Sequence, residues 1–105
     1  MESFGRRLTD MQLKQAFAKA LKLARKAQGL TQEDFSEVSS RTYMSTLERG
    51  IKSPTIEKID LIAGAMQLHP VTIVSLAYLV QNQKITPEIL MRQVADELNQ
   101  IQKKL

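Results

Sequence analysis

The segment from residues 29 to 50, GLTQEDFSEVSSRTYMSTLERG, concentrates side chains that could hydrogen-bond to the base edges of DNA. Arginine can donate two hydrogen bonds to O6 and N7 of guanine, and threonine offers a hydroxyl together with a methyl group that suits thymine. Arg41 and Thr42, with Thr46 about one helical turn later, would share one exposed helix surface. Judged by spacing alone, the alternative is a small helical bundle on which these are ordinary surface residues.

Other polar residues around this segment suit contacts with phosphate oxygens. Lys52 and Ser53 follow Gly50 in a predicted loop, and such contacts set the register of a protein on DNA without reading sequence. Gln32 opens a predicted helix, whose first backbone amides favour a phosphate. The residues predicted to contact DNA are Gln32, Ser40, Arg41, Thr42, Tyr43, Thr46, Arg49, Lys52 and Ser53.

Two short helical patterns must position these side chains. Thr31 can cap the first pattern, and Ser39 or Ser40 can cap the second, which ends at Gly50. A pair of short helices joined by a tight turn lets the second helix project into the major groove. The inward-facing residues of this pair are predicted to be Phe35, Val38, Met44 and Leu47.

Three further helices are predicted around this pair. The first follows a sequence typical of a capping box, TDMQ at residues 9–12, and stops at Gly29. Pro54 suits the first turn of a fourth helix. His69 most simply caps a fifth element, residues 71–80, whose β-branched residues would locally favour a strand. We predict a helix there, because nothing nearby could pair with a lone strand.

The sequence Thr86-Pro87-Glu88 marks the start of a last helix, because it combines a cap, a proline and an early carboxylate. Apolar residues then recur at intervals of three and four, the spacing of a two-stranded coiled-coil seam. Fully burying each would contribute about 1.5–3 kcal/mol, so we expect the seam to be covered. It could fold back on the first helix, but the strict spacing favours a homodimer. The predicted dimer interface consists of Met91, Val94, Leu98, Ile101 and Leu105.

The composition excludes several classes of function. With no cysteine and one histidine in 105 residues, we expect no metal site, no cofactor and no catalytic residues, and therefore no enzyme. Glu33, Asp34 and Glu37 could suggest acid–base chemistry, but carboxylates at a helix start are better explained by the helix dipole. No apolar run reaches the ~20 residues of a membrane span, and the N-terminus lacks the apolar region of a secretory signal. We therefore expect a cytoplasmic, nucleoid-associated protein whose net charge of +4 permits nucleic acid as a partner.

The runs L-x-x-A-R-K-A-Q-G-L-T-Q-E-D-F and S-S-R-T-Y-M-S-T-L-E-R-G-I-K-S-P-T-I-E-K-I resemble the Cro/lambda-repressor helix-turn-helix family, also called XRE-type regulators. The piece R-T-Y-M-S-T-L-E-R-G is also similar to the controller proteins of restriction–modification systems. The resemblance implies an all-α, five-helix lambda-repressor-like DNA-binding domain, usually dimeric on a palindromic operator. It also implies an ion pair between Arg25 and Glu48 that ties the first helix to the third. The predicted organisation is an N-terminal arm at 1–8, the helix-turn-helix domain at 9–80 and a C-terminal dimerisation helix at 85–105.

Two features depart from the family pattern. The motif from Gln32 to Met44 is two residues shorter than the family's, and the usual turn glycine is missing. We predict a shorter second helix and a turn that the serines form without a positive-φ glycine. Gln67 stands where the family often has a glycine that ends the fourth helix.

Two functions remain open. The first is a sequence-specific transcription regulator, expected to be a repressor, that inserts the third helix (residues 40–49) into the major groove of double-stranded DNA as a homodimer. The second is a protein-interaction module of the same fold, such as an antitoxin that binds a toxin. The outer face of the third helix is basic and polar without an apolar anchor, which favours DNA.

Overall fold

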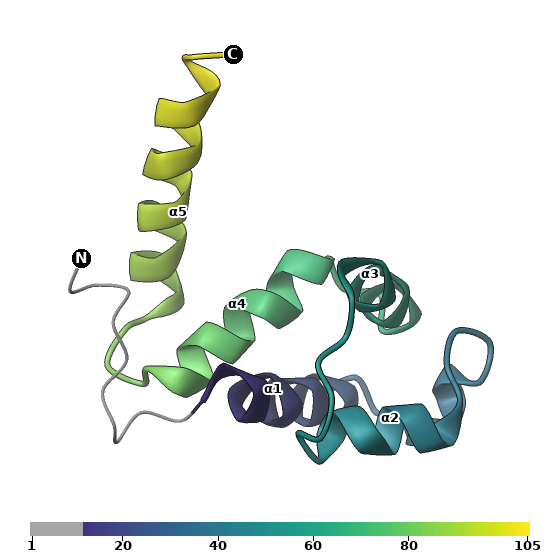
Figure 1. Ribbon diagram of the computed structural model, residues 1–105. Coiled ribbons are helices and arrows are strands. Elements are labelled where there is room, and N and C mark those ends of the chain that lie inside the picture. The colour runs from purple at the N-terminus through teal and green to yellow at the C-terminus, as the bar shows by residue number, and fades with distance from the viewer. Residues whose placement is uncertain (1–11) are drawn as a thin grey trace.

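Helices account for the regular structure of residues 12–105, the part of the chain that the computed structural model describes (Figure 1). The predicted all-α fold class is confirmed. The predicted N-terminal arm and the first three residues of the predicted capping box, residues 9–11, lie outside the described range. The elements in chain order are α1 (Leu13–Ala27), the 3-10 helix η2 (Gln32–Phe35), α2 (Arg41–Glu48), α3 (Ile56–Ala65), α4 (Pro70–Gln81) and α5 (Pro87–Gln102).

One cluster of apolar side chains holds η2 and α2, the predicted helix pair, against the rest of the fold. α1 packs mainly on α4, and α2 packs on both α1 and η2 (Figure 1). Phe35, Met44 and Leu47 are fully buried and Val38 packs against them, so the inward-facing residues predicted for the pair are confirmed. Burial of each large side chain contributes about 1.5–3 kcal/mol, which fixes α2 firmly on the domain.

Polar side chains set where four of the helices begin. His69 Nδ1 accepts a hydrogen bond from the backbone amide of Val71 at 3.0 Å, which confirms its predicted capping role. Pro54 does not lie in the first turn of α3 as predicted, because the hydroxyl of Thr55 caps that helix and Pro54 precedes the cap. The capping residues are Ser40 for α2, Thr55 for α3, His69 for α4 and Thr86 for α5.

The helix predicted after His69 is confirmed as α4, despite its β-branched residues. Ile73 and Ala77 lie on its buried face, so packing outweighs the local preference for a strand. α3 and α4 together have the length and apolar composition of a membrane span, but they are bent by 102° at the break between them. No single helix within residues 12–105 is long and apolar enough to cross a membrane.

Gln67 ends α3 in the left-handed conformation, with φ of 60°. Its amide donates to the carbonyl of Gly64 at 2.9 Å, and the amide of Leu68 donates to the carbonyl of Ala63 at 3.0 Å. These two hydrogen bonds form a Schellman motif, which usually places glycine at this position. A glutamine there strains the backbone, because its Cβ approaches the carbonyl oxygen.

The substitution Gln67→Gly should therefore stabilise the protein by about 0.5–1.5 kcal/mol, since relief of strain exceeds the added entropy of the unfolded chain. Urea denaturation of the free protein would measure the change. Gln83→Gly is a matched control, because Gln83 is exposed and has no positive φ. The control should leave stability unchanged or lower it slightly. If Gln67→Gly failed to raise the free energy of unfolding above that of wild type, the inference that Gln67 strains the backbone would be contradicted.

The last helix, α5, extends away from the other helices (Figure 1), and none of its residues is buried. Met91 is 40% exposed, Leu98 53% and Ile101 60%. The alternative in which this helix folds back on α1 is therefore not seen in the described chain. Four of the five seam residues instead lie open to solvent, and Val94 is half-buried.

Candidate nucleic-acid interface

α2 divides into a buried face and an exposed face, as a recognition helix requires. Met44 and Leu47 are fully buried against the core. On the other face Arg41 and Thr42 are exposed, as is Arg49 at the C-cap of the helix. The exposed face therefore carries two guanidinium groups and a hydroxyl that reach solvent from one helix.

The hydroxyl groups along α2 differ in what they can offer to DNA. Ser40 Oγ accepts a hydrogen bond from the amide of Tyr43 at 3.0 Å, so this hydroxyl caps the N-terminus of α2. Thr46 Oγ1 donates to the carbonyl of Thr42 at 2.8 Å and is half-buried. Thr46 therefore presents its methyl group and an accepting lone pair, whereas Thr42 is exposed.

Arg41 forms an ion pair with Glu33 of η2, with 3.1 Å between Nη1 and Oε1. Both side chains are about seven-tenths exposed, at 71% and 70%. Exposed pairs of this kind contribute about 0–1 kcal/mol, so a guanine could replace the carboxylate at little cost. The pair links the N-terminal end of α2 to η2.

The turn between η2 and α2 closes without glycine. The amides of Val38 and Ser39 both donate to the carbonyl of Phe35, at 2.9 and 2.8 Å. Among residues 12–105 a positive φ occurs at Gly29, Gly50 and Gln67, and none of these lies in this turn. The predicted shorter second helix is confirmed as a single 3-10 turn, and the predicted glycine-free turn is confirmed as well.

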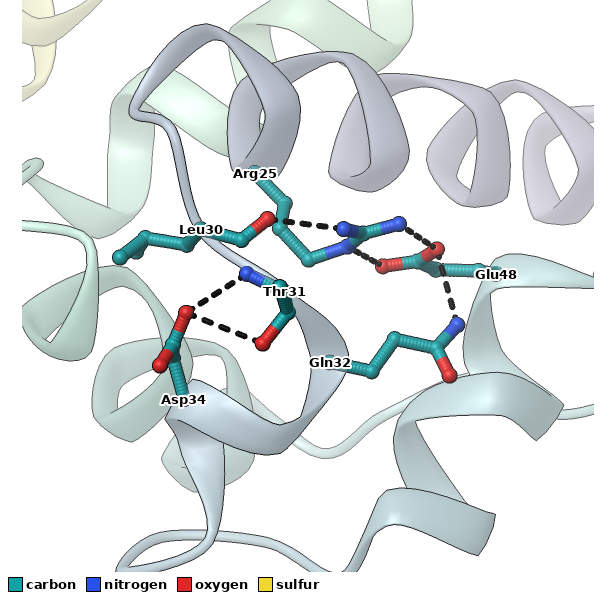
Figure 2. Close-up of polar contacts among 6 residues, drawn as sticks. All are labelled: Arg25, Leu30, Thr31, Gln32, Asp34 and Glu48. Atoms are coloured by element: carbon teal, nitrogen blue, oxygen red, sulfur yellow. Dashed lines mark hydrogen bonds and ion pairs between the residues drawn. The ribbon is translucent and has the colours of Figure 1, made fainter.

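The guanidinium of Arg25, on α1, pairs with the carboxylate of Glu48, on α2, through two hydrogen bonds (Figure 2). Nε lies 2.6 Å from Oε2, Nη2 lies 2.9 Å from Oε1, and Nη1 donates to the carbonyl of Leu30 at 2.8 Å. The two side chains are only 10% and 4% exposed. The hydrogen bond to Glu48 raises the pKa of Arg25, although burial of the guanidinium acts in the opposite direction. This pair fixes the C-terminal end of α2 to α1.

Gln32 joins the same network instead of standing free for a phosphate. Its Nε2 donates to Glu48 Oε1 at 3.2 Å, as Figure 2 shows. In the same view Asp34 accepts the amide of Thr31 at 2.7 Å, so a carboxylate of the chain itself occupies the start of η2. The predicted anion site at this helix start is therefore partly filled by Asp34.

The loop between α2 and α3 carries the remaining predicted phosphate contacts, Lys52 and Ser53, and both are exposed. Lys14 of α1 was not singled out from the sequence. The structure brings its Nζ to 3.5 Å from the carbonyl of Ile51, next to this loop. Sequence reasoning missed Lys58 entirely, whose Nζ donates to the carbonyl of Val38 at 2.9 Å.

Tyr43 was predicted at the DNA interface, but its ring is half-buried against the core. Lys58 Nζ lies 5.4 Å from the centroid of this ring, within reach of a cation–π contact. Tyr43 thus faces α3, whereas Arg41 and Thr42 are exposed to solvent.

Comparisons with known proteins agree with this geometry. The helix-turn-helix family model matches residues 21–73, half of the chain. No curated protein matches the chain. The clp gene regulator ClgR of C. glutamicum is 25% identical with a TM-score of 0.64, over 71% of this chain and 99% of that one. A variant of the restriction-modification controller protein C.Esp1396I is 25% identical with a TM-score of 0.58, over 67% and 91%. A second ClgR structure, at 21% identity, a TM-score of 0.62 and 88% and 92% coverage, shows the shared fold alone.

Proposed function

The chain belongs to the XRE-type helix-turn-helix family of DNA-binding transcription regulators, and we propose that it is a repressor that binds a palindromic operator as a homodimer. The family consists of regulators rather than enzymes. The observation that carries the proposal is the division of α2 into a buried apolar face and an exposed face with Arg41 and Thr42. Both ends of this helix are fixed. Ser40 caps its start, and the ion pair of Glu48 with Arg25 fixes its end to α1.

In the proposed complex α2 lies in the major groove with its N-terminal end toward the bases. Arg41 leaves Glu33 and donates to guanine O6 and N7, while Thr42 contacts the neighbouring base. Lys52 and Ser53, with Lys14 beside their loop, contact phosphates of the flanking backbone. Arg49, which is exposed at the C-cap of α2, would help to set register, and Gln32 would do so only by exchanging its hydrogen bond to Glu48 for one to a phosphate.

Dimerisation through α5 is the second part of the proposal. Its seam, defined above by five residues from Met91 to Leu105, leaves large apolar side chains exposed in the single chain. A second copy of the same seam would cover them, because the spacing of three and four suits a two-stranded coiled coil. A dimer would set two copies of α2 about 34 Å apart, one helical turn of DNA.

Repression would result if such a dimer bound an operator that overlaps a promoter, because the bound protein would then exclude polymerase. ClgR is by name a gene regulator and C.Esp1396I a restriction-modification controller protein, which supports regulation in general. A reporter driven by the DNA upstream of the chain's own gene tests the direction. Expression of the protein should lower reporter output, and Arg41→Ala should restore it. A rise in output with the intact protein would show activation instead.

The roles of Arg41 and Lys52 can be separated by their effects on specificity. Arg41→Ala should lose about 1–3 kcal/mol of discrimination at one base pair, because a base contact disappears. Lys52→Ala should weaken operator and random DNA alike and lower the salt slope by about 1, because a phosphate contact disappears. Binding titrations with operator variants at several salt concentrations measure both. Equal effects of the two substitutions on operator and random DNA would contradict these roles.

A further inference from the structure

We propose that Lys58 is a positioning residue: its ammonium group holds the shortened turn between η2 and α2 and thereby sets the angle at which α2 enters DNA. The consequence for DNA rests on the proposed function, whereas the contact itself is a property of the free protein. Lys58 lies in the first turn of α3, far from the turn in sequence, and its side chain is half-buried. It therefore links α3 to the recognition helix directly.

Two contacts define this link. Lys58 Nζ donates to the carbonyl of Val38 at 2.9 Å, and it lies 5.4 Å from the centroid of the Tyr43 ring. Val38 belongs to the turn before α2, and Tyr43 belongs to the first full turn of α2. One ammonium group thus contacts both the segment that aims the helix and the helix itself.

The turn closes without a glycine and leaves one of its carbonyl groups without a partner inside the turn. The amides of Val38 and Ser39 are both directed to the carbonyl of Phe35, which closes η2. The carbonyl of Val38 then lies beyond the last 3-10 hydrogen bond, where a half-buried acceptor needs a partner. Within residues 12–105 Lys58 is the donor to this carbonyl. A charged donor makes the stronger hydrogen bond, and a cation suits the C-terminal end of a helical turn.

A different role is a direct phosphate contact, which any lysine near DNA can make. The two roles differ in measurable ways. A phosphate contact contributes to affinity for every sequence and to the salt slope. A positioning contact acts through Arg41 and Thr42, so its loss lowers the ratio of operator to random affinity and leaves the salt slope unchanged.

The first experiment uses the free full-length chain and does not depend on DNA. Amide hydrogen exchange is measured by NMR at Ser39 and Tyr43, whose amides are hydrogen-bonded inside and just after the turn. Lys58→Met keeps the aliphatic stem and should speed exchange at both amides by about 10-fold, since a charge-assisted hydrogen bond is lost. Lys58→Arg should restore protection, and Lys52→Met should not change it. Unchanged exchange in Lys58→Met would overturn the proposal.

A second pair of variants covers the case in which Lys58→Met fails to fold. Tyr43→Leu removes the ring beneath the ammonium group, and Tyr43→Phe keeps it. We expect faster exchange at Ser39 for Tyr43→Leu and wild-type exchange for Tyr43→Phe. Equal exchange rates at Ser39 in these two variants would show that the contact between Lys58 and the Tyr43 ring does not hold the turn, and would overturn that part of the proposal.

The second experiment measures binding to a duplex selected by the wild-type chain from random-sequence DNA. Lys58→Met should lower the ratio of selected to random affinity by about 10-fold at an unchanged salt slope, and Lys58→Arg should recover most of it. A slope lower by about 1 with an unchanged ratio would show a phosphate contact and overturn the positioning role. If the wild-type chain selects no sequence, the proposed function fails, while the exchange experiment still decides whether Lys58 holds the turn.

Discussion

Replacing Glu48 with alanine is expected to lower the free energy of unfolding by about 3–5 kcal/mol, because it leaves a buried guanidinium without its carboxylate. Arg25 and Glu48 are 10% and 4% exposed, so little water reaches the pair in the intact protein. Arg25 would keep only its hydrogen bond to the carbonyl of Leu30. Gln32 would lose the acceptor of its amide as well. Urea denaturation followed by circular dichroism measures the loss.

Two control variants test whether the loss arises from an unpaired buried charge. Glu33→Ala removes the carboxylate of the exposed pair with Arg41 and should change stability by less than about 1 kcal/mol. The double substitution Arg25→Met with Glu48→Leu removes both charges and should recover most of the loss, because no unpaired charge stays buried. A cost for Glu48→Ala as small as that for Glu33→Ala would contradict a buried, structural pair.

The contribution of Arg25 should not vary with pH near neutrality. Its pKa is raised above an already high ordinary value, chiefly by the hydrogen bond to Glu48. A raised pKa means that the stabilisation is complete below the ordinary pKa and is lost only as pH rises through the raised value. Glu48→Ala should therefore lower the free energy of unfolding by the same amount at neutral and at mildly alkaline pH, as far as the loss arises from Arg25.

Leu98→Glu should convert the proposed dimer into a monomer and weaken operator binding by about 10²–10⁴-fold, the usual gain from linking two binding modules. In a dimer of this variant, the seam would bury a carboxylate without a partner. The free-energy cost of that burial exceeds the stabilisation that the leucine contributes at this position. Light scattering measures the oligomeric state, and titration with operator measures affinity.

Asn99→Glu is the matched control for this prediction. It introduces the same charge one residue further along α5, off the apolar seam, and Asn99 is exposed. This variant should remain dimeric and bind operator about as tightly as wild type. A dimer that survives Leu98→Glu would move the interface to another surface, for which α4 offers Val71 at 52% and Tyr78 at 41% exposure.

Local chemistry accounts for the parts of the fold that the sequence predicts well. Ser40, His69 and Thr86 stand directly before the helices they cap, so the starts of α2, α4 and α5 can be inferred from a few adjacent residues. The buried positions of η2 and α2 follow from apolar spacing in the same way. The pairing of Arg25 with Glu48 came only from the family resemblance, because the two residues are far apart in sequence.

Contacts between distant segments explain what sequence reasoning could not reach. Lys58 contacts Val38 and Tyr43 only because α3 packs beside the turn, and a lysine in a first helical turn carries no local sign of this role. Gln32 was expected to face a phosphate, but the orientation of α2 brings the carboxylate of Glu48 within its reach. Pro54 was misplaced because either Pro54 or Thr55 could begin α3, and the hydroxyl of Thr55 decides.

Whether α2 reads bases is tested by a binding selection by the 105-residue chain from random-sequence duplexes, followed by titration of the selected site and a scrambled site. If α2 reads bases, a palindromic sequence should be enriched and bound about 10³-fold or more tightly than the scrambled DNA, and its affinity should fall steeply between about 50 and 200 mM salt. No enrichment, or equal affinity for both duplexes with little dependence on salt, would contradict it.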